Sequence, residues 1–262
     1  MKWRSLEESA PGLETRRLYE IYADRKELIA QYVPAEIQLI HARVVDELKA
    51  SGIADRTPQR GAEAPAFELP DHNGKIVRSA DLLEKGPLVI CFIRGRWCPF
   101  CVGQMEAMNA IVPELEQLGA SLVAISPQTV HHSYLMADQH KLRFPLLSDA
   151  GNRIARQFGL VYRVPDCQQD VYRRVFVKLP FVNGDESSEL PIPATFILCD
   201  KGNNRQGHEG AQRRTANEIE LPTDPTGEQL GSRSIIAYAS ANPDYTDRPE
   251  PVDLVRKIPQ FL

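Results

Sequence analysis

Two cysteines three positions apart, Cys98 and Cys101, are the residues of this sequence best suited to chemistry. The run before them, residues 87–93, is apolar, short and rich in β-branched and aromatic side chains, which is typical of a buried strand. Apolar residues then recur at helical spacing from 102 to 118. Pro99 suits the first position of that helix, where a missing N–H costs nothing. We therefore expect Cys98 at the helix N-cap and Cys101 one turn inside the helix.

This placement predicts redox chemistry. A helix N-terminus carries partial positive charge and favours a thiolate over a thiol. Arg94 and Arg96 would act in the same direction if their side chains point toward the sulfur. A pair at i and i+3 on the first helical turn can bring two sulfurs into bonding range. Cys-x-x-Cys beside a strand–helix pattern is typical of a thioredoxin-like redox motif.

Other uses of the pair have less support in the sequence. A zinc site needs about four ligands, and no second Cys-x-x-Cys or Cys-x-x-His pair is present, so we expect neither a metal nor another cofactor. Inert buried cysteines are the remaining alternative. Cys91 and Cys199 fall in apolar strands, where a structural thiol is expected. Cys167 is a more distant candidate for a resolving cysteine.

The composition excludes several function classes. The 262 residues are 42% hydrophobic and 25% charged, with a net charge of −4, which is ordinary for a globular protein and gives no sign of nucleic-acid binding. No apolar run approaches the ~20 residues of a membrane span, and the first residues contain no apolar signal core. Five dispersed cysteines do not resemble a disulfide scaffold. We expect a cytoplasmic protein without membrane contact.

The elements that must position the cysteines fall into two parts. Residues 1–58 predict a helical extension of two amphipathic patterns interrupted at Val33-Pro34, which packs on the domain or forms a homodimer contact. In residues 59–262 strands alternate with helices, which predicts an α/β fold. The polar stretch 201–233 predicts a mobile insertion at the tip of a hairpin. We expect strands at 87–93, 121–126, 144–149, within 190–200 and at 234–239, and helices at 102–118, 134–142, 153–158, 166–177 and 252–257.

Several segments together resemble the alkyl hydroperoxide reductase/thiol-specific antioxidant (AhpC/TSA) family, peroxiredoxin-like proteins of the thioredoxin fold. They are Gly61–Asp71, the strand leading into Trp97–Cys101, Phe144–Asp149 and Pro193–Ile197. The helical extension and the closing Asn-Pro-Asp-Tyr stretch resemble a subgroup that carries Cys-x-x-Cys. The resemblance implies a central mixed sheet flanked by helices and a thiol-dependent, antioxidant peroxidase.

Two positions depart from the family pattern. Peroxiredoxins have a Pro, a Thr and the peroxidatic Cys in the arrangement PxxxTxxC. In this chain Arg94 stands at the Pro position, Cys98 at the Thr position and Cys101 at the peroxidatic position. An Arg that helps to hold the peroxide precedes the Thr-Phe strand in the family, whereas Pro193 stands there in this chain, as in thioredoxins. We expect a cis peptide at Ile192-Pro193, with an ordinary trans proline as the alternative.

Three functions are compatible with these residues. In the first, a peroxidase, a thiolate attacks hydrogen peroxide or an alkyl hydroperoxide, the resulting sulfenic acid condenses to a Cys98–Cys101 disulfide, and thioredoxin or a similar thiol donor reduces it. Arg94 and Arg96 would then stabilise charge on the departing oxygen. In the second, a thiol–disulfide oxidoreductase, Cys98 attacks a disulfide and Cys101 resolves it. The third is a redox-silent binding module.

The family register and the helix electrostatics indicate different cysteines as the one that attacks first. The family register indicates Cys101 as the peroxide-reactive thiol. Helix electrostatics and exposure indicate Cys98 as the more acidic and reachable thiol. We favour the pair as a unit, with Cys98 as first attacker. Trp97 is expected to pack beside the disulfide and to shape partner docking, with plain core packing as the alternative.

Overall fold

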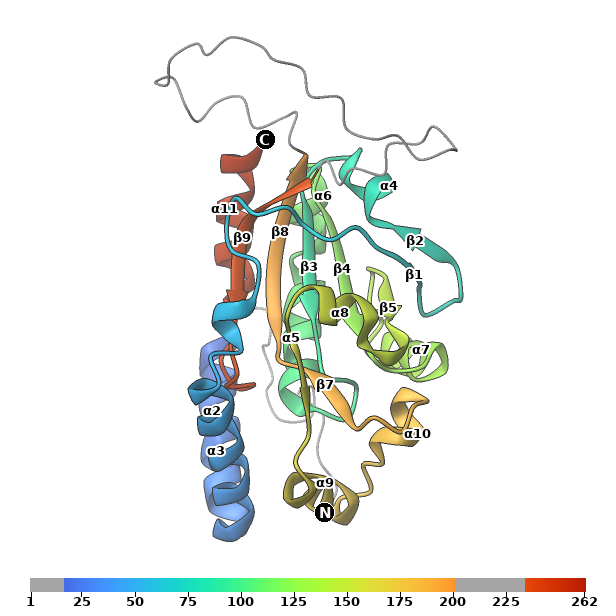
Figure 1. Cartoon of the computed structure of the whole chain (residues 1–262). Helices are drawn as coiled ribbons and strands as arrows, with labels where there is room; N and C mark the ends of the chain where they lie inside the picture. Colours follow the sequence, from blue (N-terminus) through green and yellow to red (C-terminus); the bar gives the residue numbers. More distant parts are fainter. Residues whose placement is uncertain (1–16, 201–233) are drawn as a thin grey trace.

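A five-stranded mixed sheet with the order β5-β4-β3-β8-β9 forms the centre of the fold in the computed structural model (Figure 1). The structure describes residues 17–200 and 234–262. The central strand β3 (Leu88–Phe92) pairs in parallel with β4 (Ser121–Ser126) and antiparallel with β8 (Ala194–Asp200). Strand β5 (Leu146–Ser148) extends the parallel side and β9 (Ser234–Ala241) the antiparallel side. The expected central mixed sheet is confirmed.

Strand β3 has core residues on both of its faces. Its five residues are buried, and alternate side chains of a strand point to opposite faces of the sheet. Val89 and Cys91 belong to one apolar cluster, whereas Leu88 and Ile90 belong to another. A strand that is covered on both sides reads as a continuous apolar run, which is how this segment appears in the sequence.

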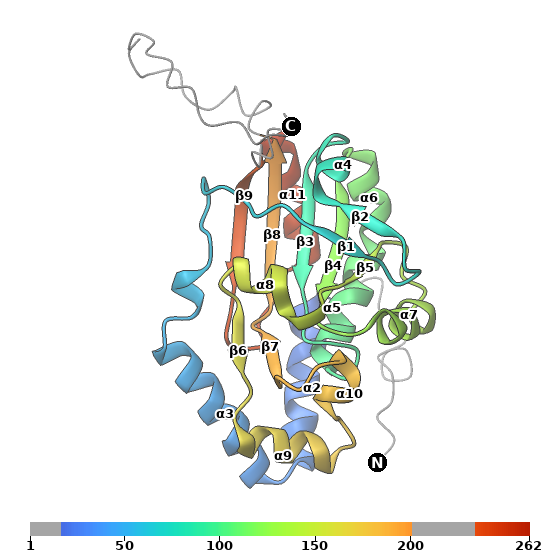
Figure 2. The same ribbon diagram turned by 45° about the vertical axis from the view of Figure 1, so that its right-hand side comes forward.

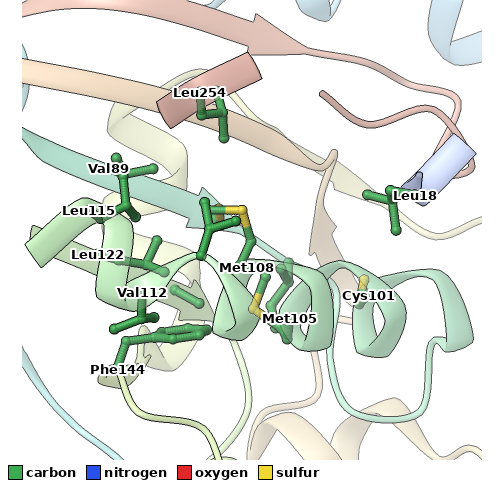
Figure 3. Packing of buried hydrophobic residues seen from close by; sticks show 14 of the residues in the cluster. Leu18, Val89, Cys101, Met105, Met108, Val112, Leu115, Leu122, Phe144 and Leu254 are labelled. Atoms are coloured by element: carbon green, nitrogen blue, oxygen red, sulfur yellow. The ribbon is translucent and has the colours of Figure 1, made fainter. Parts of the chain in front are cut away.

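Helices cover both faces of the sheet (Figures 1 and 2). The cluster on the first face includes residues of α2 (Leu18–Tyr32), α5 (Pro99–Ala110), α6 (Val112–Gln117), α7 (Val130–Gln139) and α11 (Pro251–Lys257). Figure 3 shows this cluster, in which Met105 and Met108 of α5 pack toward Leu115 and Leu122. The second cluster includes residues of α8 (Arg153–Gln157) and of the hairpin strand β1 (Glu68–Pro70).

Smaller elements complete the described chain. They are α3 (Ala35–Ala50), β2 (Ile76–Arg78), α4 (Ser79–Leu83), β6 (Val161–Arg163), α9 (Asp166–Arg174), α10 (Leu179–Asn183), β7 (Glu189–Pro191) and the 3₁₀ turns Ala54–Arg56, Ala150–Asn152 and Ile258–Phe261. Strand β1 pairs antiparallel with β2 to form a hairpin. The hairpin expected on either side of residues 201–233 is confirmed by the pairing of β8 with β9, in which Leu198 lies opposite Ile236. The 201–233 insertion lies outside the described residues.

The two N-terminal helices pack on the domain near its redox helix. Helix α2 contacts α5, and α3 contacts α9 (Figure 2). The boundary between them at Val33 and Pro34 is where the sequence predicts it. The first turn of α2 is capped from the far end of the chain, because the Glu250 carboxylate accepts from Leu18 N at 3.0 Å and from Tyr19 N at 2.6 Å. Acceptors at a helix N-terminus satisfy otherwise unpaired N–H groups.

Some elements differ from the sequence expectation. The helix expected over 102–118 is divided at Ile111, one residue before α6, which has Pro113 in its first turn. A proline has no N–H to continue the helical ladder. Helix α7 begins at Val130 rather than Tyr134, because the Thr129 hydroxyl accepts from His132 N and caps it. Helix α10 and strand β6 were not predicted.

The expected cis peptide at Ile192-Pro193 is wrong. The described residues contain no cis peptide bond. The chain runs from β7 to β8 through Ile192, whose N–H donates to Leu160 O, and Pro193, whose carbonyl accepts from Asn242 N. Because no tight turn intervenes between these strands, the trans form, which is the more stable one for most X-Pro bonds, is retained.

Candidate active site

Cys98 is the N-cap residue of α5, and Pro99 occupies the first turn, as the sequence predicts. The chain leaves β3 and turns at Gly95, whose φ of 145° favours glycine. A Cβ at this position would lie 2.7 Å from Trp97 Nε1 and 3.2 Å from Gln128 Oε1. The turn is closed by Cys98 N donating to Gly95 O at 3.1 Å. A glycine is therefore needed to bring Cys98 to the start of the helix.

The two sulfurs are adjacent and almost completely buried. Cys98 is 1% exposed and Cys101 is 0% exposed, and both are free thiols. The Cys101 thiol donates a hydrogen bond to Cys98 Sγ, and the backbone N–H of Cys101 donates to Cys98 O at 3.0 Å. The sequence prediction that Cys98 is the more reachable sulfur is not supported, because neither sulfur has appreciable exposure. The hydrogen bond between the thiols places the two sulfurs next to each other, as formation of a disulfide between them requires.

One guanidinium lies beside each sulfur. Arg94 Nη1 is 3.9 Å from Cys98 Sγ, and Arg248 Nη2 is 4.0 Å from Cys101 Sγ. Burial opposes ionisation of Cys98, but the hydrogen bonds from Cys101 and the charges of Arg94 and Arg248 outweigh it and lower the pKa of the Cys98 thiol to about 5. Burial, together with the hydrogen bond to Cys98 and the charge on it, raises the pKa of Cys101. The pair therefore holds its negative charge on Cys98.

Arg94 lies in an aromatic enclosure. It is 2% exposed, and its guanidinium carbon lies 4.8 Å from the ring centre of Trp97, 4.3 Å from that of Tyr245 and 5.7 Å from that of Tyr172. It also donates to the Tyr172 hydroxyl. The salt bridges of the described residues do not include Arg94. Because cation–π contacts leave the positive charge unneutralised, it remains free to act on the thiolate.

The N-terminal helices contribute to the enclosure around the pair. Tyr22 of α2 packs edge-on against Phe100, with 5.0 Å between ring centres, and its hydroxyl donates to Phe100 O. His41 of α3 lies 6.0 Å from the ring centre of Tyr172 and 6.1 Å from that of Tyr245. Burial and the charge of Arg94 lower the pKa of His41 to about 4, so this ring is neutral near pH 7.

The remaining sequence candidates lie at different distances from the sulfurs. Trp97 packs against Tyr172 at 4.9 Å between ring centres and against Arg94, and its role in partner docking stays a prediction. The backbone N–H of Arg96 donates to Gln128 Oε1, and the charge of the Arg96 side chain helps to lower the pKa of His132. It is not among the groups with the largest effects on either sulfur. Pro193 lies at the start of β8.

The other cysteines differ from the pair. Burial raises the pKa of Cys91 to about 12 and that of Cys199 to about 11, which fits structural thiols. Cys167 is exposed on α9. Within residues 17–200 and 234–262 there is no group of three or more His, Cys, Asp or Glu residues arranged to hold a metal ion. In the same residues no helix is both long enough and apolar enough to cross a membrane.

Sequence reasoning missed Arg248, Tyr22, Tyr172 and Tyr245. Arg248 is 147 positions from Cys101, and Tyr22 is 78 positions from Phe100. No spacing rule links residues so far apart. The Asn242–Tyr245 stretch was recognised as a subgroup feature, but the sequence did not indicate that it lies beside the redox pair.

Comparisons with known proteins show the family of the chain. A family model described as the AhpC/TSA family matches residues 60–206. The Mycobacterium tuberculosis (strain CDC 1551 / Oshkosh) protein named peroxiredoxin MT1643 is 33% identical over 111 residues, which are 42% of this chain and 72% of that protein. The thiol-disulfide oxidoreductase ResA of Bacillus anthracis is 31% identical over 103 residues, which are 39% of this chain and 58% of ResA.

A solved structure supports the fold. The crystal structure of peroxidoxin BcpB from Mycobacterium tuberculosis matches 78% of this chain and 99% of its own, with a TM-score of 0.52 and 19% sequence identity. At this identity the match shows the fold, a thioredoxin-like arrangement of a mixed sheet flanked by helices.

Proposed function

Because the chain belongs to the AhpC/TSA family, we propose that it is a thiol-dependent peroxidase in which Cys98 attacks the peroxide and Cys101 resolves the product. The observation that carries this assignment is the Cys98 sulfur, which has a lowered pKa, a guanidinium at 3.9 Å and a second thiol bonded to it. A thiolate is the form of cysteine that acts as a nucleophile. The favoured attacker is thus Cys98 rather than the residue at the family's peroxidatic position.

The burial of both sulfurs favours a small substrate. A sulfur that is 1% exposed cannot contact a disulfide on another protein surface without rearrangement, whereas hydrogen peroxide or a small alkyl hydroperoxide needs little space. Arg94 Nε is a buried donor with no acceptor among the described residues. Since buried donors are normally hydrogen-bonded, we propose that a peroxide oxygen accepts from it and that the guanidinium stabilises charge on the departing oxygen.

The reaction consumes one peroxide and two thiols. Cys98 thiolate attacks the terminal oxygen, the O–O bond breaks, and the products are Cys98 sulfenic acid and an alkoxide or hydroxide, which takes up a proton. Cys101 then attacks Cys98 Sγ and hydroxide leaves, giving the disulfide and, after protonation, water. A dithiol donor of the thioredoxin type returns both thiols. We propose that this cycle operates in the cytoplasm.

A second function, thiol–disulfide exchange, rests on the Cys-x-x-Cys at a helix N-cap and on the similarity to ResA. The two functions are separated by their substrates. Purified protein with hydrogen peroxide, a thioredoxin, its reductase and NADPH should oxidise NADPH in proportion to peroxide, and the rate should vanish in Cys98→Ser. Cys167→Ser, which removes an exposed cysteine outside the enclosure, should keep the full rate.

The outcome that would contradict peroxidase function is clear. Turnover that does not depend on peroxide, combined with insulin reduction that depends on Cys98, would assign thiol–disulfide exchange instead. A double variant, Cys98→Ser with Cys101→Ser, that equals the wild type in both assays would leave only a binding role. A sulfenic-acid probe that labels Cys101 rather than Cys98 in the first turnover would reverse the assignment of the attacker.

A further inference from the structure

Arg248 is held beside Cys101 by contacts that fix its guanidinium. Its Nε donates to Gln104 Oε1 at 3.1 Å, its Nη1 donates to Asp247 O at 3.2 Å, and its Nη2 lies 4.0 Å from Cys101 Sγ. Gln104 is 1% exposed, and its Nε2 donates to Thr195 Oγ1 at 3.4 Å. The guanidinium is therefore anchored through α5 to strand β8.

Each of the two arginines, Arg94 and Arg248, has its larger effect on a different sulfur. Arg94 acts more strongly than Arg248 on Cys98, whereas Arg248 acts more strongly than Arg94 on Cys101. In the reduced protein Cys101 is protonated and donates to Cys98, so Arg248 faces a neutral thiol. In the reduced protein Arg248 therefore adds to the effect of Arg94 on the Cys98 thiolate, while the sulfur that it contacts at 4.0 Å is protonated. Its full effect on Cys101 comes only in a step in which Cys101 is the thiolate.

That later step is the attack of Cys101 on the oxidised sulfur. Once Cys98 has become a sulfenic acid it no longer carries the thiolate charge, and Cys101 must lose its proton before it can act as a nucleophile. The charge of the pair thus moves from the sulfur next to Arg94 to the sulfur next to Arg248.

We propose that Arg248 is a catalytic residue of the resolution step, which stabilises Cys101 as a thiolate when it attacks Cys98 sulfenic acid. In this step the Cys101 proton leaves to water, an S–S bond forms, the S–O bond of the sulfenic acid breaks, and the hydroxide that leaves is protonated to water. No further oxidant is needed, because the peroxide has already oxidised Cys98. Arg248 acts again when the disulfide is reduced and Cys101 leaves as a thiolate. The inference rests on the proposed peroxidase function.

The test separates oxidation from resolution in Arg248→Gln. Reduced protein is mixed rapidly with hydrogen peroxide and quenched over time, with sulfenic acid counted by dimedone labelling and disulfide by loss of free thiols. We expect the first phase to stay within about 2-fold of the wild type. The second phase should slow by about 10- to 100-fold, the loss of thiolate that accompanies a rise of one to two pH units in the pKa of Cys101. More Cys98 should then reach the sulfinic acid.

Two control variants are measured beside Arg248→Gln. Arg248→Lys keeps the charge and should recover part of the second phase. Arg256→Gln removes an exposed arginine of α11 that pairs with Asp253 and lies outside the redox site, and it should leave both phases unchanged.

A direct measurement keeps the inference testable without turnover. In a Cys98→Ser background, the ultraviolet thiolate absorbance of Cys101 is followed against pH with and without Arg248→Gln, as the difference from the Cys98→Ser, Cys101→Ser protein. The midpoint should move to higher pH when the guanidinium is lost, a change that a purely structural role would not produce.

Several results would overturn the inference. A second phase equal to that of the wild type, or a first phase slowed as much as the second, would show that Arg248 does not act on resolution, while leaving the peroxidase function intact. Wild-type protein that forms no sulfenic acid with peroxide would overturn the peroxidase function and this inference together.

Discussion

Replacing Arg94 by glutamine removes the buried positive charge closest to Cys98 while keeping a polar side chain beside Tyr172. The relevant atoms, Arg94 Nη1 and Cys98 Sγ, are 3.9 Å apart. Two unit charges at about 4 Å attract each other by roughly 4 kcal/mol at an effective dielectric constant of about 20. One pH unit of pKa corresponds to about 1.4 kcal/mol, so this attraction sets an upper limit of roughly three pH units. Because Arg248 and the Cys101 donors remain, we expect the pKa of Cys98 to rise by about one to three pH units.

The assay is a titration of thiolate absorbance in the ultraviolet, which requires no reagent to reach the buried sulfur. The signal of Cys98 is the difference between each protein and its Cys98→Ser counterpart. The unaltered chain should titrate near pH 5, the value to which the hydrogen bonds and charges lower the pKa of Cys98. Arg94→Lys, which keeps a charge, should titrate between the wild type and Arg94→Gln. A wild-type midpoint near the ordinary thiol range, or an Arg94→Gln midpoint unchanged from the wild type, would refute the electrostatic reasoning.

Three further outcomes are expected. Gly95→Ala should lower the free energy of unfolding in urea by roughly 1–3 kcal/mol and change Trp97 fluorescence. Gly74 also has a positive φ, of 81°, but there is open space where a Cβ would lie. An equal loss of stability in Gly74→Ala would therefore contradict the clash with Trp97. Tyr22→Phe should lower the free energy of unfolding in urea by about 1–3 kcal/mol, because the buried Phe100 carbonyl loses its hydrogen-bond donor. An unchanged urea midpoint would show that this hydrogen bond does not stabilise the fold. Folding lowers the pKa of Cys98, so the stability that the Cys98 thiolate contributes is present above the unfolded-state pKa and is lost as pH falls through about 5. The melting temperature of the wild type relative to that of Cys98→Ser should therefore rise between pH 5 and pH 8. A difference in melting temperature that stays constant with pH would contradict the lowered pKa.

The placement of the redox pair could be predicted from sequence because its signals are local. A buried strand, the helical spacing of the apolar residues after it and Pro99 are enough to place Cys98 at the helix N-cap, and the structure confirms it. The hairpin of β8 and β9 was similarly clear from two apolar runs. The division of helix 102–118 at Ile111 could have been read from Pro113.

The groups that set the charge on the sulfurs could not be predicted, because they come from distant parts of the chain. Arg94 was identified by its proximity in sequence, and so was Arg96, but only Arg94 lies beside a sulfur. The second guanidinium, Arg248, reaches Cys101 through the packing of the segment after β9. The cis peptide at Pro193 was predicted by analogy with thioredoxins. The path of the chain from β7 to β8, which the sequence does not show, has a trans peptide there.

The contacts of Glu250 with α2 bear on the order in which the parts of this site are assembled. Residues 242–251 carry Tyr245, Arg248 and Glu250, so one short segment encloses the first guanidinium, supplies the second and caps the helix that bears Tyr22. The family model ends at residue 206, before this segment begins. During synthesis the cysteines emerge long before it, and until it docks Cys101 lacks its guanidinium and α2 its cap. The complete electrostatic environment of the two cysteines is thus formed late, when this segment packs beside α2 and α5.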